Sequence, residues 1–227
     1  ATNDIDIAVG ECVTSDSPYW RMALASALTK RLDAAWAVGT GNGGLDTGAI
    51  ANGTYHIWLI ARSDTGVVDA LFSTSPTSPT MPANYDRKRR IGAIVRTGAA
   101  IALFTQRGDE FLLMSAALSL SGGTFTTTAT LISLSVPSGG LQVEARVTVE
   151  YSSNSTIFGY VSSPDQTDIA ASGSAFNMLS LSNSTAAVFN GYVRTNTAGQ
   201  IRARTDASTG ATAAAITHGW LDTRGRL

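Results

Sequence analysis

The sequence has few of the side chains that build metal sites and nucleophilic catalytic sites. It contains one cysteine and two histidines among its 227 residues. A single cysteine, Cys12, excludes an internal disulfide framework. His56 and His218 lie far apart in the sequence, whereas a transition-metal site needs clustered ligands. We therefore expect no metal ion and no cofactor.

The sequence also has little charge and no long apolar run. Charged residues make up 15% of the chain, and the formal net charge is −1. No bulk field therefore attracts nucleic acid or an anionic membrane surface. No run approaches the roughly 20 apolar residues that a membrane-spanning helix needs. We expect no nucleic-acid partner and no insertion into a membrane.

The patterns of common hydrolytic enzymes are missing as well. No G-x-S-x-G motif marks a nucleophilic serine. Glycoside hydrolysis needs two carboxyl groups that flank one bond, but Glu144 and Glu150 would lie about 20 Å apart along one extended strand. His56 stands in an aromatic, strand-like run, which favours a half-buried structural residue over a general base. We expect a protein that is not an enzyme, and we name no catalytic residue.

What the sequence does contain is a series of short runs rich in β-branched and aromatic residues, which is typical of strands rather than helices. Residues 141–151 alternate most regularly, with Val143, Ala145 and Val147 on one face. Residues 20–32 fit both a helical and a strand period, and we favour a strand for their first part. Residues 32–38 are expected to form a short helical turn. The predicted strands are residues 4–9, 55–60, 67–73, 91–95, 101–104, 110–113, 125–136, 141–151, 156–161, 178–181, 187–194, 200–204 and 214–221.

The composition changes near residue 116, where Ser/Thr-rich strands replace a more varied sequence. The sequence therefore predicts an all-β protein of two antiparallel units, residues 1–116 and 117–227. The even spacing of strands in the second unit is typical of a β-sandwich, and we expect a jelly-roll-like one.

Turn residues punctuate the first unit. The tetrapeptide Ser63–Gly66 ends in glycine between two strand-like runs, which predicts a hairpin turn. Pro76, Pro79 and Pro82 each remove a backbone donor, so residues 74–85 are expected to cross over as an ordered extended segment rather than as a strand. The glycine-rich residues 39–44 lack the Lys-Ser/Thr of a phosphate-binding loop, which favours turn formation.

Residues 86–90 form the only basic run, Asp-Arg-Lys-Arg-Arg. Such a run can contact nucleic acid or a polyanionic glycan. It lacks the interleaved aromatic residues of a single-strand binder, and we favour a solvated approach to a strand. Asp69 is a candidate carboxylate partner for Arg89 or Arg90.

Several segments of the first unit occur in a characteristic order: GLDTG (residues 44–48), TYHIWLI (54–60), DALFSTSPTSPTMPANY (69–85), RRIGAI (89–94) and FTQRGDEFL (104–112). Together they resemble a tract found in fibre-type virion proteins of tailed bacteriophages and prophages. The resemblance spans roughly residues 20–114. The segment GWLDTRGR (219–226) also resembles the ending of such proteins.

The resemblance implies a virion structural protein, a tail-fibre, head-fibre or spike component that contacts the host surface. The implied partners are copies of the chain itself, in a homotrimer by analogy with fibres, other virion proteins and a host surface glycan or receptor. One alternative is an architectural subunit that decorates the capsid or forms a fibre base. A lesser alternative is a glycan-cleaving enzyme.

A glycan site needs amides or carboxylates that bond to sugar hydroxyls, beside an aromatic ring. Tyr160, Asp165, Gln166 and Asp168 offer this combination within one strand and the loop after it, and loops on rigid scaffolds are frequent binding sites. They are our candidate glycan-binding residues. The alternative is that this loop is a plain solvated connection and that Tyr160 points into the core.

Overall fold

The computed structural model describes residues 2–153, 157–172, 180–181, 187–206 and 211–225. The chain divides into two compact units. Unit 1 comprises residues 1–102 and 224–227, and unit 2 comprises residues 103–223. Every regular element in the described part of the chain is a strand, so the predicted all-β class is confirmed.

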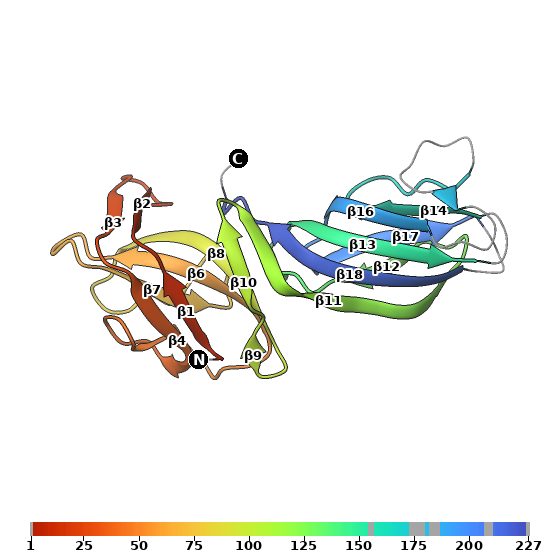
Figure 1. Ribbon diagram of the computed structural model, residues 1–227. Helices are drawn as coiled ribbons and strands as arrows, with labels where there is room; N and C mark the ends of the chain where they lie inside the picture. Colours follow the sequence, from red (N-terminus) through yellow and green to blue (C-terminus); the bar gives the residue numbers. More distant parts are fainter. Residues whose placement is uncertain (1, 154–156, 173–179, 182–186, 207–210, 226–227) are drawn as a thin grey trace. The chain divides into compact units, whose positions relative to one another are not determined.

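The main sheet of unit 1 has the strand order β1-β4-β5-β7-β6-β8-β9 (Figure 1). Strands β2 (Gly10–Val13) and β3 (Arg21–Leu24) form a separate hairpin. The bounds of the sheet strands are β1 Asp4–Ile7, β4 Leu28–Ala35, β5 Gly43–Leu45, β6 Gly53–Ala61, β7 Val68–Ser73, β8 Arg87–Thr97 and β9 Ala100–Ile101.

The hairpin turn predicted at residues 63–66 is confirmed, whereas Gly43 and Gly44 of the predicted glycine-rich turn belong to a strand. The Arg62 N–H donates to the Val67 carbonyl and the Gly66 N–H to the Arg62 carbonyl, each at 2.9 Å, and these bonds close the β6–β7 hairpin. Gly66 has a φ of 73°, which glycine adopts without steric cost. The proline-rich segment contains no strand and carries the chain from β7 past β6 to β8.

Strands β4 and β5 depart from two predictions, and the first concerns the direction of β5. It pairs in parallel with β4 and β7, whereas the other described strand pairs are antiparallel, as expected. The helical turn predicted for residues 32–38 is wrong, because β4 continues as a strand through Ala35. The close approach of β5 to β4 depends on Gly43, where a Cβ atom would lie 2.0 Å from the Ala35 carbonyl oxygen.

Both faces of β6 are buried, which explains why its sequence is apolar without alternation. On one face, Leu59 and Ala61 pack with Met22 and Leu24 of the β3 strand. On the other face, Trp58 and Ile60 pack with Leu71 and Tyr85, and the partly buried side chains of Trp36 and Met81 cover them. The hairpin and the crossover segment therefore enclose the sheet from opposite sides.

A buried ion pair lies inside unit 1. The Lys30 Nζ atom is 3.2 Å from Asp69 Oδ1, and the two side chains are 0% and 1% exposed. Lys30 also donates to the carbonyls of Ala37 at 2.6 Å and Gly39 at 3.2 Å, and lies 5.4 Å from the Trp36 ring centroid. The Gly39 N–H donates to Asp69 Oδ2 at 2.7 Å. Burial lowers the pKa of Lys30, and the Asp69 carboxylate opposes that shift.

Unit 2 is a β-sandwich, as predicted, and Figure 1 shows its two sheets as layers. The order of one sheet is β10-β11-β18-β13-β16, and that of the other is β12-β17-β14-β15. The bounds are β10 Phe104–Arg107, β11 Glu110–Phe125, β12 Thr130–Ser133, β13 Glu144–Ser152, β14 Ile157–Ser162, β15 Ser180–Leu181, β16 Ala187–Arg194, β17 Gln200–Thr205 and β18 Ala211–Leu221.

The alternation predicted for residues 141–151 is confirmed. Val143, Ala145, Val147 and Val149 are buried, while the intervening residues are half-buried or exposed. Of the other predicted strand segments, residues 156, 178 and 179 lie outside the described residues.

The boundary between the units lies earlier than the expected position at residue 116. It falls between Ala102 and Leu103. Residue 116 lies within β11, which pairs with β18 along most of its length. The change in composition near this point therefore occurs inside a continuous strand.

We expect Asp69→Ala to destabilise unit 1 by about 3–5 kcal/mol, because it leaves the Lys30 ammonium buried without its carboxylate. Urea unfolding followed by tryptophan fluorescence measures this, since Trp20, Trp36 and Trp58 all belong to unit 1. The matched control is Asp64→Ala, which removes the carboxylate of an exposed pair with Arg62 and should shift the midpoint far less. Equal shifts for the two variants would contradict a structural role for the buried pair.

Candidate functional site

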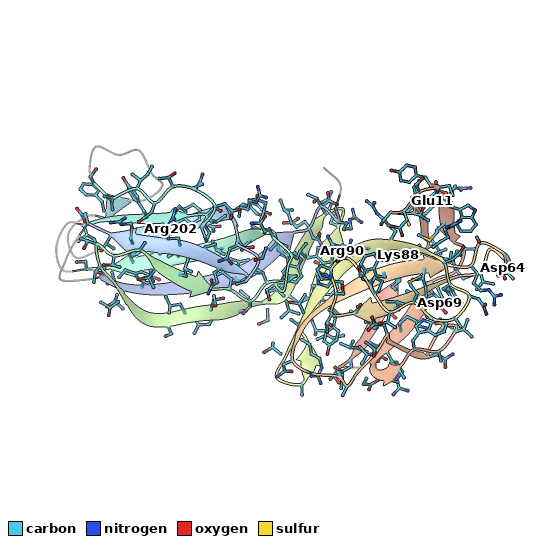
Figure 2. All side chains as sticks on the ribbon, turned by 180° about the vertical axis from the view of Figure 1, so that it is seen from behind. Glu11, Asp64, Asp69, Lys88, Arg90 and Arg202 are labelled. Carbon is cyan, nitrogen blue, oxygen red and sulfur yellow. The ribbon has the colours of Figure 1, made fainter. Side chains whose placement is uncertain are left out.

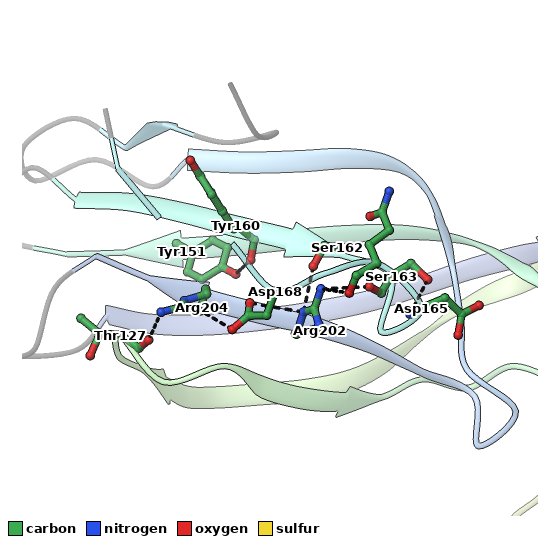
Figure 3. Close-up of polar contacts among 10 residues, drawn as sticks. Thr127, Tyr151, Tyr160, Ser162, Ser163, Asp165, Asp168, Arg202 and Arg204 are labelled. Carbon is green, nitrogen blue, oxygen red and sulfur yellow. Dashed lines mark hydrogen bonds and ion pairs between the residues drawn. The ribbon is translucent and has the colours of Figure 1, made fainter. Parts of the chain in front are cut away.

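The four residues predicted as a glycan site do not form an open aromatic platform. Tyr160 lies in β14 and is 5% exposed. Its hydroxyl is 3.3 Å from the Ser172 carbonyl, to which it donates, and its own carbonyl accepts a hydrogen bond from the Tyr151 hydroxyl at 3.0 Å (Figure 3). Gly159, the preceding residue, faces the interior ring of Tyr151, whereas Tyr160 shares the opposite face of the sheet with Arg204. The ring is therefore buried beneath the loop that follows β14, where a sugar ring cannot stack on it.

The polar residues of the predicted site are close together but are held by neighbouring side chains. Asp165 Oδ2 accepts a hydrogen bond from the Gln142 amide at 2.7 Å and lies 3.6 Å from Arg194 Nε. The Gln166 carbonyl accepts a hydrogen bond from Arg202 at 2.8 Å. These contacts tie the loop to the strands beside it.

Asp168 is bound by two arginines of β17 (Figure 3). One carboxylate oxygen lies 3.5 Å from Arg202 Nε, and the other accepts a hydrogen bond from Arg204. Arg202 also donates to the Ser163 carbonyl at 3.2 Å. The carboxylate thus serves the internal structure of the loop, and the arrangement matches the plain connection considered as the alternative.

Unit 1 contains a pocket that the sequence did not predict. Its volume is about 570 Å³. It lies between the β2–β3 hairpin and β8; Figure 2 marks Glu11 on the hairpin, and Lys88 and Arg90 on β8. The lining residues are Glu11, Cys12, Val13, Thr14, Tyr19, Arg89, Arg90, Ile91 and Arg224.

A β-bulge explains why three successive residues of β8 line one pocket. Ile57 of β6 pairs with Gly92, whereas the next residue, Trp58, pairs with Arg90, so Ile91 is the additional residue. Side chains of a regular strand alternate between two faces, and a bulge locally changes their direction. The bulge therefore allows Arg89, Arg90 and Ile91 to border the same space.

Backbone and side-chain contacts fix the hairpin loop against β8. The Ser15 N–H donates to the Lys88 carbonyl at 2.9 Å, and Lys88 Nζ lies 2.9 Å from Asp16. Within the loop, the Thr14 N–H donates to the Trp20 carbonyl and the Trp20 N–H to Thr14 Oγ1, each at 2.9 Å. These bonds close the loop that carries Tyr19, which is 74% exposed.

The pocket lining is positively charged. It contains the guanidinium groups of Arg89, Arg90 and Arg224 and a single carboxylate, that of Glu11. Glu11 is already paired with Arg21 of β3. Within the described part of the chain, the guanidinium of Arg89 has no hydrogen-bond or ion-pair partner. The pocket therefore offers the guanidinium of Arg89, which the carboxylate of Glu11 does not neutralise.

Cys12 is the only thiol, and it lines the same pocket. Burial raises the pKa of this thiol, and the nearby Arg89 charge lowers it by a smaller amount. The net increase keeps Cys12 protonated at neutral pH, and a protonated thiol is a poor nucleophile. The pocket therefore provides binding groups rather than an activated nucleophile.

Partial signals for this pocket are present in the sequence. The run at residues 86–90 identified Arg89 and Arg90 as basic, but regular alternation predicted that only one of two neighbours faces outward. Asp69, which was a candidate carboxylate partner for Arg89 or Arg90, forms its ion pair with Lys30. Tyr19 and Cys12 could not be connected to β8 from the sequence, because the fold of the hairpin brings them there.

Comparison with known proteins adds no family assignment. No family model matches the chain, and no curated protein matches it. Among the described residues, no group of three or more histidine, cysteine, aspartate or glutamate side chains could hold a metal ion. That part of the chain also has no helix long and apolar enough to cross a membrane.

Replacement of Tyr160 tests its burial beneath the loop that follows β14. We expect Tyr160→Ala to lower the free energy of unfolding by about 3–5 kcal/mol, as for other large aromatic side chains removed from cores. Chemical unfolding followed by circular dichroism measures this. Tyr192→Ala, at an exposed tyrosine of the same unit, is the control and should have a much smaller effect. A Tyr160→Ala protein as stable as the control would place the ring on the surface.

The pH dependence of Cys12 alkylation tests the contact between the hairpin and β8. We expect the rate with iodoacetamide to rise with an apparent pKa above 9.0, the ordinary value for this thiol. Arg89→Gln should raise this pKa further, since the thiolate loses a nearby cation. Arg87→Gln, on the same strand but paired with Asp86, should leave it unchanged. An unaltered pKa in Arg89→Gln would show that the guanidinium does not lie beside the thiol.

Proposed function

We propose that this chain is a structural component of a phage virion, a fibre or spike subunit that contacts the host cell surface through unit 1. The observation that carries the proposal is where the fibre-like tract lies. Its first four segments form β5 to β8 of the unit 1 sheet, and its last segment forms β10 and the start of β11 in unit 2. The first residues of the segment RRIGAI, Arg89 and Arg90, line the cationic pocket.

The architecture supports a binding role. Both faces of β6 are buried, and a hydrogen bond and an ion pair anchor the hairpin loop to β8. A recognition surface on a rigid scaffold loses little conformational entropy on binding. Burial keeps the thiol of the pocket protonated, which supports a recognition role for this pocket. The protein acts in this proposal at the surface of the phage particle, together with other virion proteins.

We extend the proposal to assembly with copies of the chain, most simply a homotrimer. The strand β11 exposes three apolar side chains, Leu112, Met114 and Leu118. Apolar groups concentrated on one exposed element support contact with another protein surface. Closed symmetry satisfies such surfaces without leaving them open to further association.

Two measurements on phage particles and cells test this function. An antibody against the chain should label a fibre or spike of the virion in electron microscopy. Purified chain added to host cells in advance should slow phage adsorption, because it occupies the receptor. Labelling without slower adsorption would favour the architectural alternative, and release of reducing sugar ends from the host glycan would favour the enzyme.

The same purified chain tests the assembly. Light scattering should give a mass three times the 23.6 kDa of the chain. A mass of one chain at high micromolar concentration would contradict self-assembly of this segment.

A further inference from the structure

We propose that the pocket between the β2–β3 hairpin and β8 binds an acidic saccharide, with its carboxylate or phosphate at Arg89 and its sugar ring against Tyr19. The inference rests on the proposed function, because it assigns a ligand class to the surface that contacts the host. It replaces the predicted site at Tyr160 and Asp168 with a site in the other unit.

The charge of the pocket selects an anion. Guanidinium groups bind carboxylates and phosphates through paired, charge-assisted hydrogen bonds. Arg89 and Arg90 approach the pocket from one bulged stretch of β8, and Arg224 adds a third cation. Neighbouring carboxylates already engage Lys88 and Arg87 of the same run. Arg89, which lines the pocket and whose guanidinium has no partner among the described residues, is therefore the member of the run offered to a ligand.

Tyr19 adds the apolar surface that a sugar ring requires. Its side chain is 74% exposed although it borders a pocket, and the hydrogen bonds of Thr14 and Trp20 hold its loop in place. An aromatic side chain combines an apolar face with a polar tip at low entropic cost. Val13 extends this apolar border on the hairpin. A free inorganic anion would gain nothing from these two residues.

The size of the pocket favours a short saccharide over a nucleic acid. A volume of about 570 Å³ lies in the range of small-molecule sites, roughly 300–1,000 Å³. Single-strand binders instead use a long basic groove with several stacking aromatic side chains. The pocket has one exposed tyrosine, and the chain has a net charge of −1.

Calorimetric titration of the full chain with defined probes tests the assignment. The probes are a trimer of galacturonic acid, a hexose monophosphate, a neutral trimer of galactose, inorganic phosphate and a short single-stranded DNA. We expect binding of one or both acidic sugars, at least tenfold weaker binding of the neutral trimer, and weakening by added salt. The two acidic probes distinguish a carboxylate from a phosphate ligand.

Matched variants localise the binding. Arg89→Gln should weaken binding of the acidic sugar by about tenfold or more, whereas Arg87→Gln on the same strand should not. Tyr19→Ala should weaken binding of the acidic sugar but not of inorganic phosphate, and Tyr192→Ala in unit 2 should change neither. Circular dichroism of each variant confirms that it is folded.

Several results would overturn the inference. The first is that neither acidic sugar binds, and the second is that Arg89→Gln binds the acidic sugar as tightly as the wild-type chain. The third is that inorganic phosphate or DNA binds as tightly as the acidic sugars. The fourth is that Tyr19→Ala leaves binding of the acidic sugar unchanged. The adsorption assay separates this inference from the proposed function. If wild-type chain and Arg89→Gln slow adsorption equally, the pocket is not the site although the function stands. If neither slows adsorption, host contact itself is contradicted.

Discussion

The buried ion pair of Lys30 and Asp69 is the constraint on which the arrangement of unit 1 depends. It joins β4 to β7 across β5, and it fixes the loop before β5 through the carbonyls of Ala37 and Gly39. A buried charge that loses its partner is strongly destabilising, so the two strands must stay in one register. Through the ladder from β7 to β6 and β8, this register sets the position of the arginines that border the pocket.

The pocket arises where three local features meet. The hairpin loop is closed on itself by Thr14 and attached to β8 by the Ser15 N–H, while the bulge at Ile91 turns neighbouring side chains toward one space. None of these three features corresponds to a continuous sequence motif. The loop at Asp165 and Asp168 differs from the pocket, because each of its two carboxylates already has an arginine neighbour within unit 2. A cluster of polar residues becomes a binding site only when its charges are not satisfied internally.

Local patterns in the sequence predicted much of the fold and little of the site. Alternation identified β13, and turn chemistry identified the β6–β7 hairpin, because both depend on residues that are neighbours in the chain. The helical turn predicted at residues 32–38 is wrong because pairing with β5, which reaches Ala35, overrides the local preference. The direction of the Tyr160 side chain and the pocket shared by Tyr19 and Arg89 depend on packing between distant segments. Alternation and turn residues do not predict such packing.

The central claim is that unit 1 presents a cationic pocket that takes the acidic part of a host saccharide. Nuclear magnetic resonance of the arginine side-chain N–H groups, recorded while a trimer of galacturonic acid or a hexose monophosphate is added, tests this claim most directly. The account predicts that the Arg89 Nε–H resonance shifts in a saturable way and that the Arg202 and Arg204 resonances of the other unit stay in place. Saturable shifts confined to Arg202 and Arg204, or no shift at Arg89 with either sugar, would contradict it.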